Sequence, residues 1–236
     1  MQVLSQYAIE YIGRKITAKQ LAMLRLYEKE LLTWNEKINL TAVIDPEMIQ
    51  IKHFLDSFSC LRVIQNSRCD KVIDVGTGAG FPGIPLKIIH PSMQLTLVES
   101  IKKKAEFCIY MRDSLKLDGI DIIQNRIEVI GQSQSHREQY DWALARAVAY
   151  LPTLVEYLLP LVRIGGSALA MKGENAINET HQSNHAIQIC GGHLRKIESV
   201  NLPRVNENRY LVIIDKIVAT PSQYPRRIGI PSKKPL

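Results

Sequence analysis

Residues Lys71-Val72-Ile73-Asp74-Val75-Gly76-Thr77-Gly78-Ala79-Gly80-Phe81-Pro82-Gly83-Ile84-Pro85-Leu86 decide how this chain folds. The first five are rich in β-branched side chains and suit a buried parallel strand. Glycines then occupy alternate positions of the next turn, so the backbone there can approach a ligand closely. The two prolines tolerate the first turn of a helix. The stretch therefore predicts a strand, a glycine turn and a helix that together form a pocket for a nucleotide-like ligand.

The glycine spacing leaves the identity of that nucleotide open. A dinucleotide fingerprint, Gly-x-Gly-x-x-Gly, fits only from Gly78 to Gly83, which is out of register because Gly76 is the first glycine after the strand. In the expected register the last glycine position is taken by Phe81. S-adenosylmethionine carries no phosphate and needs only the bare backbone, so it is compatible with Gly-x-Gly-x-Gly. A tight turn without any ligand is compatible too.

Composition sets broad limits on the function. The 236 residues are 46% hydrophobic and 22% charged, which allows one large domain with an appendage. The net charge of +7 favours a polyanionic partner such as nucleic acid, although it also serves solubility. Four scattered cysteines without a CxxC pair, no signal-peptide core and no apolar run of roughly 20 residues predict a reduced, cytoplasmic protein without a membrane segment.

Residues 1–65 are expected to form a helical N-terminal cap. Thr17 to Gln20 match a capping box, and apolar side chains follow at helical spacing. Asp45 directly before a proline predicts the start of a second helix. His53 and Asp56 share a face of that helix, and we interpret the pair as a structural tie.

Residues 66–219 alternate strand and helix patterns, which predicts a mainly parallel sheet with right-handed crossovers. The last two expected strands, Leu194–Leu202 and Arg209–Ile217, are joined by a loop too short for a crossover helix, so they should pair antiparallel. Such an ending is typical of S-adenosylmethionine-dependent methyltransferases, whereas nicotinamide domains usually run parallel to their sixth strand. The predicted class is α/β: a Rossmann-like class I methyltransferase sheet, mainly parallel with an antiparallel C-terminal strand pair, preceded by a helical N-terminal subdomain. The other strands are expected at 71–75, 94–98, 121–124, 142–145 and 168–171.

Basic side chains gather in two places. A helix expected from Ile101 to Leu117, with Ser100 as its cap, begins with three lysines that oppose the helix dipole. They suit an RNA phosphate, with a solvated charge run as an equal alternative. The Pro-rich tail, residues 220–236, has no acidic side chain and is expected to be extended and available to phosphates. The RNA-binding candidates are Lys102, Lys103, Lys104, Arg226, Arg227, Lys233 and Lys234.

Ligands of open α/β sheets bind beyond the carboxyl ends of the parallel strands, so residues at those ends should converge on one crevice. Glu99 ends the second strand, where a carboxylate accepts hydrogen bonds from the ribose hydroxyls of a nucleoside. Ile127 is expected to pack on adenine, and Glu128 to meet its exocyclic amine. Arg146 is expected against the cofactor carboxylate or the substrate, with a structural ion pair as the alternative.

Five motifs stand in a specific order: Asn39-Leu40-Thr41, His53-Phe54-Leu55-Asp56-Ser57, Asp74 through Gly83, Ala145-Arg146-Ala147 and Met171-Lys172-Gly173. Over nearly the whole chain from about Tyr27, they resemble the glucose-inhibited division protein B family, bacterial methyltransferases of guanine N7 in 16S ribosomal RNA. The resemblance implies S-adenosylmethionine as cofactor, and 16S ribosomal RNA or the small ribosomal subunit as partner. Part of that family has a similar tail. From the residues and the resemblance together, the cofactor-binding candidates are Gly76, Gly78, Phe81, Glu99, Ile127, Glu128 and Arg146.

Guanine N7 presents an unprotonated lone pair at neutral pH, so its methylation needs no general base. The rate then depends on alignment and exclusion of water, effects worth about 7 to 11 kcal/mol. Arg146 and Lys172 are candidates for orienting guanine O6 or a phosphate, and no catalytic residue is assigned. We favour a monomer and leave open the target nucleotide and the choice between naked RNA and an assembled subunit.

Two other functions fit parts of the sequence. A nicotinamide oxidoreductase would explain the offset glycine pattern, but its catalytic His or Tyr-Lys signature is missing. A noncatalytic RNA-binding module would explain the charge alone. His181 and His185 have zinc-ligand spacing, but without a third ligand or an HExxH motif we expect no metal site.

Overall fold

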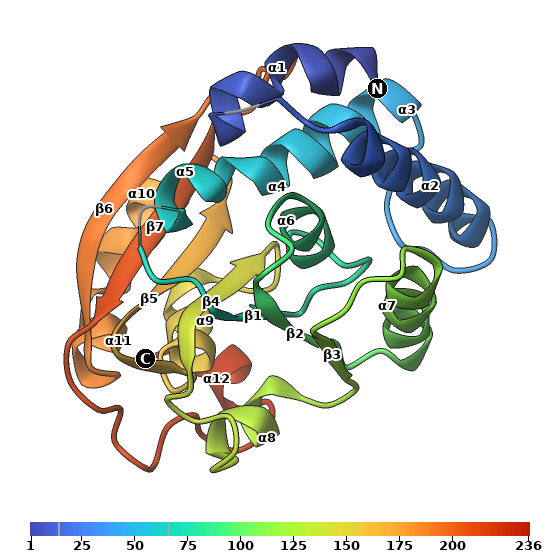
Figure 1. The fold of residues 1–236 in the computed structure, drawn as a ribbon. Coiled ribbons are helices and arrows are strands. Elements are labelled where there is room, and N and C mark those ends of the chain that lie inside the picture. The colour runs from blue at the N-terminus through green and yellow to red at the C-terminus, as the bar shows by residue number, and fades with distance from the viewer. Residues whose placement is uncertain (14, 66) are drawn as a thin grey trace.

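The computed structural model describes residues 1–13, 15–65 and 67–236. Its centre is a seven-stranded sheet of order β3-β2-β1-β4-β5-β7-β6 (Figure 1). Strands β1 to β5 run parallel, and β7 pairs antiparallel with β5 and β6. The predicted class and the antiparallel C-terminal pair are therefore confirmed. The strands are β1 Lys71–Val75, β2 Gln94–Val98, β3 Ile120–Ile123, β4 Tyr140–Arg146, β5 Val162–Lys172, β6 Gly192–Val200 and β7 Arg209–Lys216.

The bounds of β1 and β2 are as predicted, whereas β5 begins at Val162, six residues before the expected start at Ala168. The register between β4 and β5 shifts between Tyr140 and Trp142, opposite the stretch that contains Gly165 and Gly166. Glycines inside a strand often mark such an irregularity. Because glycine has a low strand propensity, the sequence predicted only the second half of this strand.

Helices cover both faces of the sheet (Figure 1). Alternation along β1 explains this, because Val72 packs into one hydrophobic cluster and Ile73 into the other. The first face is covered by α1 Gln2–Ile12, α2 Ala18–Asn35, α3 Pro46–Ile49, η1 Gln50–Leu55, α4 Asp56–Ser59, α5 Leu61–Ile64, α6 Gly83–Ile89 and α7 Lys102–Ser114. The second is covered by α8 Ile127–Gln132, α9 Leu151–Leu158, α10 Ala176–Gln182 and α11 Asn184–Ile189, with α12 Ile230–Lys233 against α9. Within the described ranges, no helix is long and apolar enough to cross a bilayer.

Two of the N-terminal helices, α2 and α3, begin where their caps predicted. Thr17 Oγ1 accepts the backbone N–H of Gln20 at 3.2 Å, and the Gln20 side chain accepts the Thr17 N–H at 3.0 Å. Asp45 Oδ1 accepts the N–H of Met48 at 2.8 Å. The second helix, however, contains a π-helical segment, Gln50–Leu55, between α3 and α4. This wider turn, a feature common at functional sites, places His53 and Asp56 beneath the end of β4.

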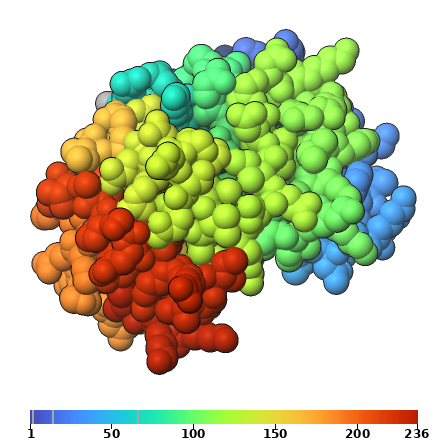
Figure 2. Space-filling model, turned by 90° about the horizontal axis from the view of Figure 1, so that it is seen from below, coloured from blue at the N-terminus to red at the C-terminus, as the bar shows by residue number. Residues whose placement is uncertain are grey.

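The expectation of an extended tail is wrong. Tyr224, Pro225 and Pro231 are buried, and the chain ends in the short helix α12. Figure 2 shows the tail, in red, lying against the yellow-green surface of the region around α8. The guanidinium of Arg226 is bound to the fully buried carboxylate of Glu156, with Nη2 and Oε2 2.6 Å apart. The prolines of the tail predicted an extended chain, but two of them, Pro225 and Pro231, pack against the second face of the domain.

Candidate functional site

All three glycines of the turn after β1 have a left-handed backbone. Gly76, Gly78 and Gly80 have φ of 64°, 60° and 91°. A Cβ on Gly76 would lie 2.7 Å from Cγ2 of Val148, and one on Gly80 would lie 2.5 Å from Cδ1 of Ile84. A Cβ on Gly78 would meet no atom of the described residues within 4 Å. Two of the glycines are thus required by their protein neighbours, and Gly78 leaves open space beside the bare backbone.

A buried carboxylate holds the turn from below. Asp74 Oδ2 accepts hydrogen bonds from Thr77 Oγ1 at 2.6 Å and from the N–H of Gly83 at 2.9 Å. A Cβ on Gly83 would approach this oxygen to 2.9 Å, so glycine is needed where α6 begins. Oδ1 of Asp74 is buried and has no hydrogen-bond partner among the described residues. Burial raises the pKa of Asp74 to about 6.

A second carboxylate holds the turn from the end of β2. Glu99 is 6% exposed, and its Oε2 accepts the N–H of Gly78 at 2.9 Å. Its Oε1 accepts the N–H of Ile101 at 2.8 Å. The expected Ser100 cap of α7 is wrong, because Ile101 is the N-cap residue and none of the described side chains accepts a cap hydrogen bond from the first turn. Glu99 and the glycine turn do meet, as their positions at neighbouring strand ends predicted.

One cavity, which we call the turn cavity, opens beside Gly76 at the carboxyl ends of β1 and β2 and has a volume of about 240 Å³. It lies where the strand order reverses between β1 and β4, the usual ligand position in open α/β sheets. The structure brings three of the predicted cofactor residues, Gly76, Ile127 and Glu128, together in its wall. Other lining residues are Ser100, Asn125, Val148, Ala149, Tyr157 and Gly229.

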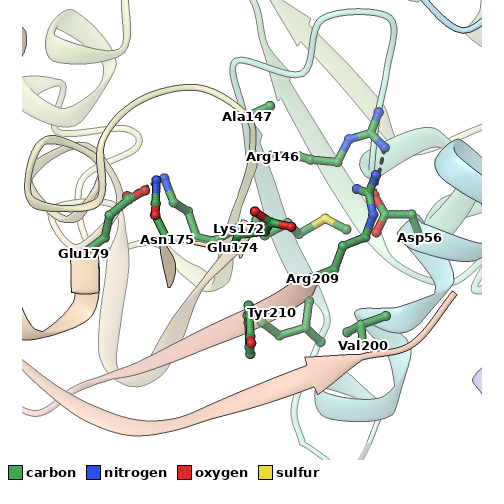
Figure 3. Close-up of a pocket in the computed structure, with 13 residues that line it drawn as sticks. Asp56, Arg146, Ala147, Lys172, Glu174, Asn175, Glu179, Val200, Arg209 and Tyr210 are labelled. Atoms are coloured by element: carbon green, nitrogen blue, oxygen red, sulfur yellow. Dashed lines mark hydrogen bonds and ion pairs between the residues drawn. The ribbon is translucent and has the colours of Figure 1, made fainter. Parts of the chain in front are cut away.

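A second cavity of about 410 Å³, which we call the arginine cavity, lies under the ends of β4, β5 and β7 (Figure 3). Both orientation candidates, Arg146 and Lys172, line it. Its other lining residues include Asp56, Ala147, Glu174, Glu179, Arg209 and Tyr210. The side chain of Arg146 is on the face of β4 that Trp142 and Leu144 share, which is why it meets the N-terminal helices.

Two guanidinium groups share one carboxylate in the arginine cavity. Asp56, 4% exposed, has its Oδ2 3.1 Å from Arg146 Nη1 and 3.4 Å from Arg209 Nη1. Figure 3 shows both arginines beside Asp56. Nε of Arg209 is buried without a hydrogen-bond partner among the described residues. Arg209 Nη2 also lies 3.4 Å from Oε2 of Glu207, so carboxylates balance the two guanidinium charges. The cluster still has an excess of hydrogen-bond donors, which suits an anion or a carbonyl oxygen.

Phe81 connects this cluster to the glycine turn. Its ring is 3% exposed and stacks on Tyr27 at 5.2 Å and on His53 at 4.6 Å between ring centroids. The guanidinium carbon of Arg146 lies 4.9 Å from the centroid of the same ring. Burial and the nearby arginine lower the pKa of His53 to about 3, so this imidazole is neutral. The ring of Phe81 is thus enclosed by protein side chains, and its predicted contact with a cofactor remains a prediction.

A short loop after β4 separates the two cavities, since Ala147 lines the arginine cavity and Ala149 the turn cavity. Ala147 has a φ of +55°, an uncommon and strained conformation for a residue with a side chain. Lys172 Nζ donates to the carbonyl of Ala149 at 2.9 Å and lies 2.6 Å from Oε2 of Glu179. Figure 3 shows Lys172 directed toward Glu179 and away from the arginines. In this structure Lys172 holds the dividing loop.

The RNA-binding candidates are distributed unevenly. Lys102 and Lys103 are exposed at the start of α7, and Lys104 is half-buried. In the tail, Arg227, Lys233 and Lys234 are exposed, whereas Arg226 is engaged with Glu156.

Sequence reasoning missed Arg209. The sequence did contain a signal for it. When a strand runs antiparallel to the strand beside it, its first residue lies next to the last residues of that strand, so Arg209 could have been placed at the edge where the parallel strands end.

Comparison with known proteins decides the family. Residues 20–209 match the profile of the family described as GidB, rRNA small subunit methyltransferase G. This chain belongs to that family. Proteins named ribosomal RNA small subunit methyltransferase G are 44% identical in Alkaliphilus metalliredigens, over 95% of this chain and 94% of the relative, and 45% identical in Roseiflexus castenholzii, over 95% of both chains. The family expected from the motifs is therefore confirmed.

Solved structures support the methyltransferase fold of this family member. An S-adenosylmethionine-dependent O-methyltransferase from Thermotoga maritima is 14% identical, with a TM-score of 0.55 over 81% of this chain and 72% of the other. TrmN from Thermus thermophilus is 15% identical, with a TM-score of 0.54 over 69% of this chain and 48% of TrmN, so the match spans about half of that protein. At such identities the likeness concerns the fold alone.

Proposed function

We propose that this protein transfers a methyl group from S-adenosylmethionine to N7 of a guanosine in 16S ribosomal RNA, acting in the cytoplasm as a monomer. Membership of the rRNA small subunit methyltransferase G family supports the reaction class. The observation that carries the proposal is the pairing of a bare glycine turn with a donor-rich cavity across one short loop. The first can hold a nucleoside cofactor, and the second can hold the base that receives the methyl group.

The glycine turn, Glu99 and the turn cavity together fit S-adenosylmethionine, although neither Gly78 nor Glu99 lines that cavity. Gly78 leaves open space beside its backbone, where a Cβ would otherwise stand. Glu99 ends β2 next to this space, and a carboxylate at that position can accept hydrogen bonds from ribose hydroxyls. Ile127 and Glu128 line the turn cavity together with Gly76, and they offer an apolar surface and an acceptor for adenine. When bound, the cofactor supplies an electrophilic methyl group on its sulfonium.

The residues of the arginine cavity would then position guanine. N7 reacts through its own lone pair, so no proton has to be removed. The pKa of His53, lowered to about 3, makes this imidazole a weak base, which is consistent with such a reaction. Arg146 and Arg209 can donate to guanine O6 or to a phosphate. An arginine that bound both O6 and N7, as in DNA readout, would block the nucleophile, so the proposal requires donation to O6 without N7. Orientation and exclusion of water would supply the rate.

Incubation with labelled methyl donor and either 16S RNA or small ribosomal subunits tests the proposal. We expect label in one guanosine, at N7, and the comparison of the two substrates shows which form is used. Label on another atom, or none with either substrate, would defeat the proposal. Tight NAD(P) binding without S-adenosylmethionine binding would favour the oxidoreductase alternative.

A further inference from the structure

The C-terminal tail forms part of the wall of the turn cavity. Gly229 and Ser232 line this cavity, opposite the glycine turn that contributes Gly76. The N–H of Gly229 donates to Oε1 of Glu128 at 2.9 Å, and the hydroxyl of Tyr157 lies 3.3 Å from the same oxygen. Both contacts use Oε1, which leaves Oε2 of Glu128 for a ligand.

The tail is anchored to the domain by charged side chains. Arg226 Nε and Nη2 contact the two carboxylate oxygens of Glu156 at 2.9 and 2.6 Å, and the Arg226 backbone N–H donates to Oε1 at 2.7 Å. Glu156 is fully buried. Arg137 donates to the carbonyls of Thr220 and Tyr224, both at 2.7 Å. Bidentate contacts of this kind fix geometry as well as position.

We propose that the tail is a component of the cofactor site: it orients Glu128 so that this carboxylate recognises the exocyclic amine of adenine. The inference rests on the proposed function, because it assigns a role within the same site. It gives the tail a role other than RNA binding and places it among the elements that determine adenine specificity. The tail lies outside residues 20–209, the part that matches the family profile.

Two unreactive ligands distinguish this role from a merely structural one. S-adenosylhomocysteine carries the adenine amine, and S-inosylhomocysteine has a carbonyl oxygen in its place, which would repel the Glu128 carboxylate. Isothermal titration of the full-length protein with each ligand gives a ratio of dissociation constants, without RNA and without turnover. We expect the unmodified protein to prefer the adenine ligand by at least tenfold.

The informative variant is Arg226→Met combined with Glu156→Gln. It removes the ion pair without leaving a buried unpaired charge. The glutamine side chain at position 156 still offers an oxygen to the backbone N–H of residue 226. We expect weaker S-adenosylhomocysteine binding and a ratio that falls toward one. Arg227→Met is the matched control, since it removes an exposed charge from the next position of the same segment. It should keep both the affinity and the ratio.

Each outcome bears on a separate claim. If the unmodified protein binds neither ligand, the proposed function fails, and the inference about the tail fails with it. If it binds the adenine ligand and the double variant keeps the same ratio, the inference alone is overturned. Should the double variant not fold, Arg226→Lys decides the question, because it keeps the charge and loses the bidentate contact. An unchanged ratio in that variant would overturn the inference.

Discussion

Arg146 at the end of β4 and Asp56 at the start of α4 form an ion pair of 3.1 Å that joins the sheet to the N-terminal helices. The carboxylate is 4% exposed, so the pair is largely removed from water. Arg209 approaches the same oxygen from β7. Three segments that are far apart in the sequence therefore meet at one charge, beside the cavity that we assign to guanine.

Arg146→Met should separate a substrate role from a cofactor role. The change leaves Asp56 with Arg209 alone, so we expect a loss of unfolding free energy of roughly 3 kcal/mol. Methyl transfer should fall at least a hundredfold, while the dissociation constant of S-adenosylhomocysteine changes less than threefold, because Arg146 lines the arginine cavity. Denaturant titration, a methyl-transfer assay and calorimetry measure the three quantities.

Arg163→Met is the control for this change. Arg163 pairs with Asp141, whose side chain is also 4% exposed, at the opposite end of β4. It should show a similar loss of stability with activity retained. If Arg146→Met instead weakened cofactor binding as much as methyl transfer, Arg146 would belong to the cofactor site, as the sequence motif implied.

Gly78→Ala should weaken cofactor binding while the protein stays folded. The new Cβ would enter the open space beside the turn, and the φ of 60° adds a backbone cost of roughly 1–2 kcal/mol. We expect at least a tenfold rise in the dissociation constant of S-adenosylhomocysteine by calorimetry. Gly13→Ala carries the same backbone cost, with a φ of 68° and nothing within 4 Å of its Cβ, at the end of α1. Equal affinity in the two variants would show that Gly78 faces no ligand.

Stability should depend on pH through two groups, His53 and Asp74, whose contributions change with pH in opposite directions. The pKa of His53 is lowered from 6.5 to about 3, so its contribution to stability is lost as the pH falls from 6.5. The pKa of Asp74 is raised from 3.8 to about 6, so its contribution is lost as the pH rises through 6. For each group the free energy of unfolding changes by about 1.4 kcal/mol per pH unit, and the two changes offset each other between about pH 4 and 6.

Single variants should reveal how much each group contributes to the pH dependence of stability. Relative to the unmodified protein, His53→Gln should gain stability as the pH falls from 6.5 to 4, and Asp74→Asn should lose stability over pH 6 to 4. Urea unfolding at half-unit pH steps measures both differences. A His53→Gln curve that stays parallel to that of the unmodified protein would show that this histidine has an ordinary pKa.

Lys103→Gln should weaken RNA binding in a salt-dependent manner. Lys103 is exposed at the start of α7, and a contact to one phosphate would reduce the slope of log affinity against log salt by about 0.7 to 0.9. Lys116→Gln is the control, because Lys116 is exposed just beyond the other end of the same helix, roughly 20 Å away. Filter binding of 16S RNA at several salt concentrations measures both. Identical slopes for the two variants would mean that the lysine run is only a solvated charge cluster.

The local chemistry of this protein could be predicted from the sequence, because it depends on near neighbours in the chain. The β-branched run before Gly76 forms β1, Thr17 and Asp45 cap their helices, and the short loop before Arg209 makes the last strands antiparallel. Each outcome follows from local backbone geometry or connection length. The predictions were wrong for the start of β5, which contains two adjacent glycines, and for the proline-rich tail. In both places tertiary packing outweighs local propensity.

Only the tertiary structure decided which residues meet. The alternation of β4 directs Arg146 to the face of the sheet that carries Asp56, and the short loop after Arg146 divides the expected single crevice into two cavities. The same packing distinguishes glycines that look equivalent in sequence. A Cβ on Gly76 would clash with Val148, whereas a Cβ on Gly78, whose backbone is also left-handed, would meet no described residue within 4 Å. Contacts between distant segments depend on the register and the face of every element between them, and a local pattern does not contain that information.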